Sequence, residues 1–217
     1  MSKYRQLKQH TSTCAAVIIS TAMCSNLANA GLMVNSIDME VRSSSFNYQG
    51  GYNITQLQNE FYQGGSEICS ISLENIDRVG SRQSCDGPGR NFATLISIDL
   101  VSGGDTKIQF GPDWGRGGVF FTDSHSEDFT GDRWWAYQWN NPAVIEVDIN
   151  EGARTVNFLG WEGCCAGGNS ARFSTDGGES WDLFSVDATV SEPAAISLFG
   201  LGIALLARAR NDKSKRA

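Results

Sequence analysis

The stretch Ile37-Asp38-Met39-Glu40-Val41 alternates strictly between apolar and acidic residues. A period of two places the apolar side chains on one face of a β-strand and the charged ones on the other. Similar patterns predict further strands at 68–73, 95–100, 108–110, 144–149, 156–159 and 171–173. Glycine pairs between these segments supply turns. Short strands at roughly 8–12-residue spacing predict an all-β fold, an antiparallel β-sandwich or jelly roll.

One segment, 54–61, has a helical period instead. Ile54, Leu57 and Phe61 fall on one face over about two turns, which predicts a short amphipathic helix. No long-period repeat is present, so a propeller or a solenoid is disfavoured.

Composition supports one folded body between two unusual ends. The chain has 217 residues, of which 41% are hydrophobic and 19% charged, with six tryptophans to fill a core. The central residues 31–189 carry 9 basic and 22 acidic side chains, a net charge of −13. A body this acidic repels phosphate backbones, so we expect no nucleic-acid partner.

Residues 1–30 have the pattern of a secretory signal peptide. A basic start is followed by an apolar stretch at 15–23, and Ala28-Asn29-Ala30 supplies the small residues that signal peptidase accepts. We expect cleavage before Gly31 and export through the inner membrane.

The C-terminal end, 190–217, combines an apolar run with a basic tail. Residues 194–207 would form a helix of roughly 21 Å, shorter than a ~30 Å hydrocarbon core. By itself this is a marginal anchor, with the basic tail 208–217 on the cytoplasmic side.

The order of features at this end resembles the PEP-CTERM sorting signal of Gram-negative bacteria. The residues that carry the resemblance are Glu192, Pro193, Arg208 and Arg210, although Ser191 stands where the family has a first proline. The resemblance implies an exosortase-type transpeptidase as partner. It also implies a transiently membrane-anchored precursor that is released to the cell surface or extracellular matrix.

Four cysteines, Cys69, Cys85, Cys164 and Cys165, remain after signal cleavage. In an exported protein they predict disulfides, with three possible pairings. We favour Cys69–Cys85, which leaves the neighbours Cys164 and Cys165 to form a strained disulfide with each other; pairing each of these two with Cys69 or Cys85 stays open. The run Cys164-Cys165-Ala166-Gly167 also resembles the CCXG group of PEP-CTERM proteins, which implies no activity.

A turn is predicted at Ser174-Thr175-Asp176-Gly177-Gly178-Glu179-Ser180-Trp181, which resembles the Asp-box, S-x-D-x-G-x-T-W. The motif residues are Ser174, Asp176, Gly178, Ser180 and Trp181. The Asp176 carboxylate is expected to accept turn N–H groups while Trp181 folds over the turn. A single copy implies a structural hairpin over 171–186.

Aromatic residues are the main binding candidates. If 134–139 is a strand, Trp135, Tyr137 and Trp139 share one face, either as half of the core or as a platform for sugar rings. Two glycine-rich loops add the candidates Trp114 with Arg116, and Trp161. These tryptophans either form a binding surface or fold back as lids over the sandwich.

Candidates for other chemistry are sparse. Asp123, Glu127, Asp128 and Asp132 form an acidic cluster that is a weak Ca²⁺ candidate, with a solvated loop as the better interpretation. We expect no other cofactor or metal. His125 is the only histidine after the signal peptide, and no catalytic motif accompanies it. Glu127, Asp132 and Glu162, which lie near aromatics in the sequence, are the candidate carboxylates for glycoside hydrolysis.

We therefore expect a non-enzymatic, exosortase-processed protein of the cell surface or matrix, associated with exopolysaccharide. Two alternatives remain, a carbohydrate-binding module and a glycosidase-like hydrolase. The hydrolase would need two carboxylates roughly 5–10 Å apart in a cleft.

Overall fold

The structure, a computed structural model, describes residues 30–186. The predicted signal peptide, except for Ala30, and the predicted sorting signal lie outside the described residues. Within the described range, no helix is both long and apolar enough to cross a membrane.

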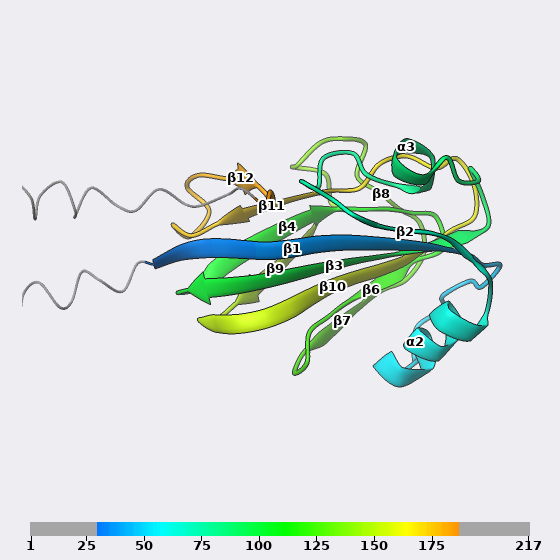
Figure 1. Cartoon of the computed structure of the whole chain (residues 1–217), viewed down its shortest axis with the longest axis horizontal. Coiled ribbons are helices and arrows are strands. Elements are labelled where there is room, and N and C mark those ends of the chain that lie inside the picture. The colour runs from blue at the N-terminus through cyan, green and yellow to red at the C-terminus, as the bar shows by residue number, and fades with distance from the viewer. Residues whose placement is uncertain (1–29, 187–217) are drawn as a thin grey trace, which may run out of the picture. The chain divides into compact units, whose positions relative to one another are not determined.

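Two β-sheets form the body of the fold (Figure 1). The larger has the strand order β2-β1-β3-β10-β6-β7, and the smaller has the order β12-β11-β4-β9. The larger sheet comprises β1 (Ala30–Ser43), β2 (Glu67–Ser72), β3 (Phe92–Gly103), β6 (Gly118–Phe121), β7 (Ser126–Phe129) and β10 (Gly152–Glu162). The smaller comprises β4 (Thr106–Gly111), β9 (Ile145–Ile149), β11 (Ser170–Ser174) and β12 (Asp182–Leu183). This is the all-β sandwich that the alternating sequence predicts.

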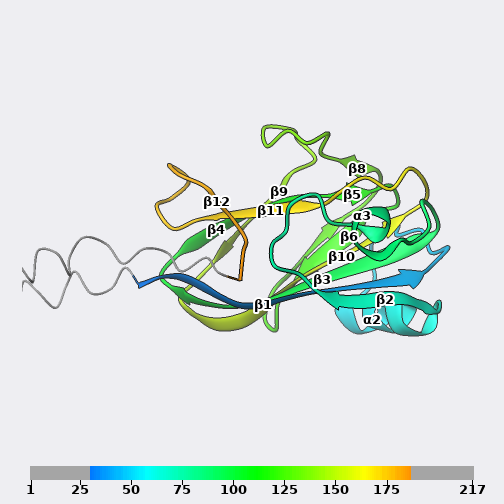
Figure 2. The same ribbon diagram turned by 45° about the horizontal axis from the view of Figure 1, so that its top comes forward.

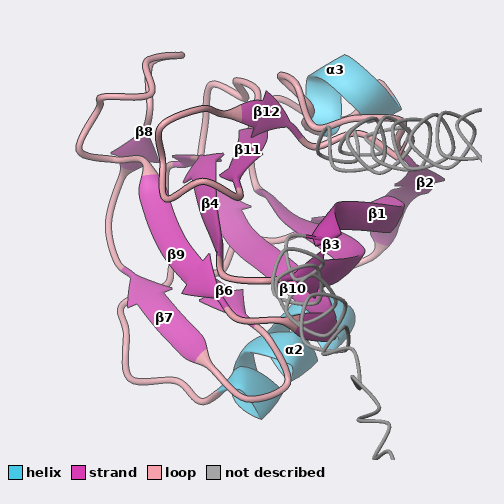
Figure 3. Ribbon diagram, turned by 90° about the vertical axis from the view of Figure 1, so that its left-hand side faces the viewer, coloured by secondary structure: helices cyan, strands magenta, loops and turns pink. Residues whose placement is uncertain are grey.

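Three shorter pieces complete the fold. Strands β5 (Asp113–Trp114) and β8 (Arg133–Trp134) pair with each other, and α3 (Ser81–Cys85) lies toward the same end of the sandwich (Figure 2). The helix α2 (Ile54–Gln63) matches the helical period of 54–61 and lies on the larger sheet (Figure 3).

Alternation builds the core between the sheets. On β3, Ile96, Ile98 and Leu100 are buried in the core, whereas the intervening side chains lie on the other face. Across the sandwich, Phe110 of β4 stacks on Phe158 of β10 with ring centroids 4.1 Å apart. Each large apolar side chain buried this way contributes about 1.5–3 kcal/mol.

A second, smaller core lies under α2, on the face of the larger sheet that points away from the smaller one. Leu57 and Phe61 of the helix are buried there, in the same cluster as Leu159 and Trp161 of β10. Asn53 begins the helix with a capping box: its side chain accepts from the Gln56 N–H, and the Gln56 side chain accepts from the Asn53 N–H. The capping box fixes where the helix begins, and Leu57 and Phe61 pack it on this face of the sheet.

The disulfide Cys69–Cys85 joins β2 to α3, which confirms this half of the favoured pairing. The predicted disulfide between Cys164 and Cys165 is wrong, because both are exposed free thiols in the loop after β10. The alternative that pairs them with Cys69 and Cys85 is wrong, because these two partners are bonded to each other.

The prediction that Trp114 and Trp161 form an exposed binding surface is wrong. Their side chains are 2% and 0% exposed, one in each core. The glycines around them are packing sites rather than flexible loop residues: a Cβ at Gly160 would lie 2.0 Å from Trp114 Nε1, and one at Gly118 would lie 2.4 Å from Trp114 Cε3. Arg116, the third residue of this prediction, is half-buried and donates from Nη2 to Asn91 Oδ1 at 2.9 Å.

The segment 134–139 is not a strand beyond Trp134. Ala136 and Tyr137 have φ values of 53° and 57°, in the left-handed region, and the chain turns there. A turn, rather than one face of a strand, therefore brings the rings of Trp135, Tyr137 and Trp139 together.

The contact between Trp114 and Gly160 gives a stability test. Gly160→Ala should lower the free energy of unfolding by roughly 1–3 kcal/mol, because the new methyl group overlaps the buried indole. Gly104→Ala, where a Cβ meets nothing within 4 Å, is the matched control and should change stability much less. Chemical denaturation measures both, and equal stabilities would contradict this packing.

Candidate functional site

A pocket of about 300 Å³ lies on the outer face of the smaller sheet. We call it the aromatic pocket; it is lined by Asp77, Arg78, Trp135, Tyr137, Trp139, Arg172, Trp181 and Leu183. It gathers three of the predicted binding residues, Trp135, Tyr137 and Trp139. Segments from 77 to 183 thus meet at one place in the fold.

The turn at 135–139 fixes the first three rings. Trp135 is buried against Gly111, where a Cβ would lie 2.3 Å from its ring, and its Nε1 donates to the Gly168 carbonyl at 2.9 Å. The rings of Tyr137 and Trp139 lie 5.4 and 4.7 Å from that of Trp135 between centroids. Trp135 is therefore a core residue that supports two more accessible rings.

The accessible rings differ in burial. Tyr137 is 40% exposed, and its hydroxyl accepts from the Gly168 N–H at 3.2 Å. Trp139 is half-buried. The core interpretation of the aromatic row therefore holds for Trp135, and Tyr137 and Trp139 are its more accessible members.

The Asp-box turn supplies the fourth ring. Asp176 accepts from the Ser174 hydroxyl at 2.6 Å and from the Ser180 N–H at 3.0 Å, while the Gly178 N–H donates to Ser174 Oγ at 2.8 Å. These hydrogen bonds hold the pKa of Asp176 well below its usual range. Trp181 Nε1 donates to the Gly178 carbonyl at 3.1 Å, and the turn joins β11 to β12 in the predicted hairpin.

Two arginines complete the aromatic pocket, and sequence reasoning missed both. The Arg172 guanidinium lies over the Trp139 ring at 4.3 Å and over the Trp181 ring at 4.7 Å from the centroids. Arg78 lies over the Tyr137 ring at 4.8 Å. Such contacts contribute about 0.5–2 kcal/mol each and hold the cations in place. No local pattern marks these residues, because they are far apart in sequence.

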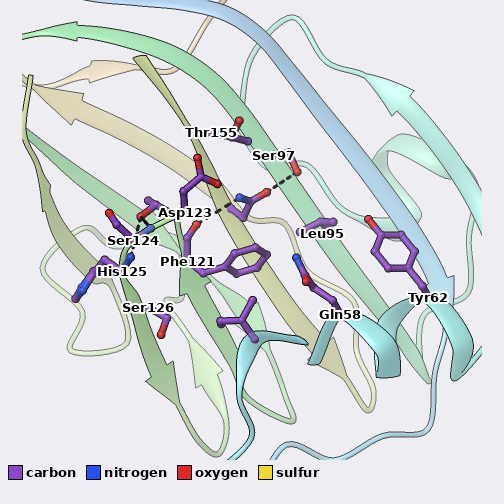
Figure 4. Close-up of a pocket in the computed structure, with 13 residues that line it drawn as sticks. Gln58, Tyr62, Leu95, Ser97, Phe121, Asp123, Ser124, His125, Ser126 and Thr155 are labelled. Atoms are coloured by element: carbon purple, nitrogen blue, oxygen red, sulfur yellow. Dashed lines mark hydrogen bonds between the residues drawn. The ribbon is translucent and has the colours of Figure 1, made fainter. Parts of the chain in front are cut away.

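A second pocket, of about 580 Å³, lies on the larger sheet beside α2 (Figure 4). We call it the sheet-face pocket. Gln58 and Tyr62 reach it from α2, and Ser97 and Thr155 reach it from the sheet. Ser97 donates to Asn157 Oδ1 at 2.8 Å. The sequence signal for the sheet-face pocket is the row of polar residues at alternate positions of β3 and β10.

The acidic cluster does not form a metal site in the described part of the chain, where no three potential ligands converge. Asp123 lines the sheet-face pocket, while Asp132 lines a different pocket beside Trp134. Glu127 Oε1 lies 2.9 Å from His125 Nε2 at the surface, and Asp128 is exposed on β7. The weak Ca²⁺ prediction for these residues therefore has no support from the geometry.

Two buried carboxyl groups anchor the loop that carries Cys164 and Cys165. Glu162 is 3% exposed and accepts from the N–H groups of Gly115 at 2.9 Å and Cys164 at 2.8 Å. Asp113 is 8% exposed and accepts from the Gly167 N–H. Burial raises the pKa of Glu162, and burial with nearby carboxylates raises the pKa of Asp113 to about 7. Glu162, named above as a candidate for hydrolysis, is occupied in holding this loop.

Each pocket offers a single carboxylate, Asp77 in the aromatic pocket and Asp123 in the sheet-face pocket. A glycosidase needs two carboxylates that flank the scissile bond.

Comparisons with known proteins give a likeness of fold. No family model and no curated protein matches the chain. Among solved structures, the PA14 domain of the antifreeze protein MpAFP is 15% identical over 82% of this chain and 94% of its own, with a TM-score of 0.45. The epithelial adhesin 6 A domain of Candida glabrata, solved with Galb1-3GlcNAc, is 11% identical over 73% and 91%, with a TM-score of 0.43. The adhesin 9 A domain of the same organism, solved with Galb1-4GlcNAc, is 10% identical over 70% and 86%, with a TM-score of 0.42. With such scores, function has to be argued from this chain's own residues.

The buried Asp113 gives a pH test. Its pKa of about 7 in the fold, against an ordinary value of 3.8, means that the folded state binds the proton more tightly. The stabilisation is complete below about pH 4 and is lost as the pH rises through 7. Asp113→Asn mimics the protonated acid and keeps an acceptor for Gly167, so the variant should exceed the wild type by roughly 1–3 kcal/mol at pH 8.

Denaturation curves between pH 4 and 8 measure this gap. Asp182→Asn, which removes the same charge from an exposed position on β12, is the control and should track the wild type. A constant difference between Asp113→Asn and wild type across this range would contradict the linkage.

Proposed function

We propose that this chain is an exported carbohydrate-binding protein that attaches to exopolysaccharide through the aromatic pocket. The observation that carries the proposal is the meeting of Tyr137, Trp139 and Trp181 around a pocket of about 300 Å³. This size is at the lower end of small-ligand sites, which run from about 300 to 1,000 Å³. Aromatic side chains with a polar tip suit a ligand that has both apolar and hydroxylated parts.

The pocket also has polar groups at its wall. Arg78 and Arg172 are donors, and Asp77 is an acceptor whose Oδ1 already takes the Ser170 hydroxyl at 3.2 Å. Sugar hydroxyls need both kinds of partner. Tyr137 accepts a hydrogen bond from the Gly168 N–H, and Trp181 donates one to the Gly178 carbonyl. These bonds fix both rings before any ligand arrives, so little conformational entropy is lost on binding.

Export is the second part of this proposal. It is supported by the signal peptide pattern of residues 1–30 and by the Cys69–Cys85 disulfide, since disulfides persist in oxidising compartments. Processing by an exosortase-type enzyme, with a transient inner-membrane stage, rests on the PEP-CTERM-like residues 190–217 alone.

Paired ring deletions test where a polysaccharide binds. In affinity electrophoresis through gels that contain the host's exopolysaccharide, Trp139→Ala should lose most of the retardation of the mature protein, because a wall of the aromatic pocket is gone. Tyr62→Ala, which removes an exposed ring that lines the sheet-face pocket, should keep it.

Thermal melting of both variants checks that they fold. The reverse pattern, loss with Tyr62→Ala alone, would move the site to the sheet-face pocket. Full retardation of both folded variants would reject both pockets.

Intact mass spectrometry tests the export route. In a host with an exosortase, the mature protein should begin at Gly31 and lack residues 198–205. Deleting Arg208 and Arg210 from the gene should leave an uncut, membrane-associated species. A mature form that still contains 198–205 in the unaltered protein would contradict the processing.

A further inference from the structure

The ring faces of the aromatic pocket already have occupants. Arg172 covers Trp139 and Trp181, and Arg78 covers Tyr137, with distances to the ring centroids of 4.3, 4.7 and 4.8 Å. A sugar ring cannot stack on a face where a guanidinium already lies. The rings therefore serve to hold two cations, and the guanidinium N–H groups are the chemistry that the pocket offers.

Neither guanidinium is neutralised by an ion pair within the described residues. By contrast, two other cations form ion pairs. Arg42 Nη1 lies 2.7 Å from Glu40 Oε1, and Lys107 Nζ lies 3.3 Å from Glu146 Oε1 and 3.1 Å from Asp148 Oδ1. Within the described residues, Arg172 uses only its Nε in a hydrogen bond, which it donates to Gln109 Oε1 at 2.8 Å.

The acids beside the aromatic pocket are already engaged. Glu146 accepts from Lys107 through Oε1 and from Gln109 through Oε2, and Asp77 accepts from Ser170. Gln109 thus separates Glu146 from Arg172, with one side-chain hydrogen bond to each. These contacts leave the terminal nitrogens of Arg172 available to a ligand.

An ordered arginine is well suited to one ligand chemistry. Its planar fork matches a carboxylate, with two parallel N–H···O bonds that are stronger than bonds between neutral groups. Stacking on rings reduces the entropy that the side chain loses when it binds. Two such forks line one pocket in a body whose net charge is −13.

We propose that the aromatic pocket selects acidic sugars, and that Arg78 and Arg172 bind the carboxylate of a uronic acid residue in the polysaccharide. This inference rests on the proposed carbohydrate binding and names its ligand class. The net negative charge of the body opposes loose adsorption of a polyanion, so binding has to come from this local pair of cations.

The test compares each acidic polysaccharide with its own carboxyl-reduced form, which has the same backbone. Mature protein at physiological ionic strength is titrated with polygalacturonate, alginate and hyaluronan, and with the carboxyl-reduced neutral form of each. At least one carboxylated polymer should bind at least tenfold more tightly than its reduced form. Polyglutamate, which has carboxylates but no sugar, should bind no better than the neutral polymers.

Variants then locate the binding. Arg172→Gln and Arg78→Gln should each weaken binding to the preferred polymer about tenfold or more, and Arg172→Lys, which keeps the charge but loses the fork, should weaken it as well. Arg133→Gln is the matched control: this guanidinium lies 5.2 Å from the centroid of the Phe129 ring but outside the aromatic pocket, and its loss should change affinity less than twofold. Melting curves check each variant, and the exposed Arg78 provides the test if Arg172→Gln does not fold.

The outcomes separate this inference from the proposed function. Equal binding to acidic and reduced polymers, lost with Trp139→Ala, would overturn the acidic selectivity and leave carbohydrate binding standing. Binding to none of these polymers or to the host's exopolysaccharide would overturn both. Acid-selective binding that both arginine variants retain would overturn the assignment to this pocket.

Discussion

The antiparallel pairing of β3 with β10 is the constraint on which the rest of the structure depends. It runs without a break from Gly152 opposite Ser102 to Glu162 opposite Phe92. Because side chains alternate along both strands, this one register assigns every residue of the pair to the inner core or to the outer face. The inner set packs on the smaller sheet. The outer set is divided in two: Leu159 and Trp161 lie under α2, and the polar positions beyond the helix form the sheet-face pocket.

Local periodicity made the strands and the helix predictable, because those signals repeat every two or 3.6 residues within one segment. The aromatic pocket had no such signal. Arg78 and Arg172 meet only after β11 has paired between β4 and β12, and 94 positions separate them in the chain. Tyr137 and Trp139 were expected to share a strand face, but a left-handed turn at Ala136 and Tyr137 places them instead.

The glycine-rich segments around Trp114 and Trp161 show why composition misleads. Their glycine content predicts two loops whose tryptophans either form a binding surface or fold back as lids. Gly118 and Gly160 are in fact opposite each other on β6 and β10, and their missing side chains leave the space that the Trp114 indole fills. A glycine that admits a large ring and a glycine that loosens a loop look alike in a sequence, because the difference lies in a residue that is distant along the chain.

Two walls of the aromatic pocket, the rings of Trp139 and Trp181, are positioned by local turns rather than by the sandwich core. Trp181 is held by the Asp-box turn, whose hydrogen bonds all lie within residues 174–181, and Trp139 follows the turn at 136–137. Arg172 projects between them from β11, the strand that leads directly into the Asp-box turn. The pocket therefore needs no ligand to assemble it, and a preformed site discriminates by the chemistry of its groups rather than by closure around a ligand. In this fold that chemistry is a pair of cations held on aromatic rings, within a body of net negative charge.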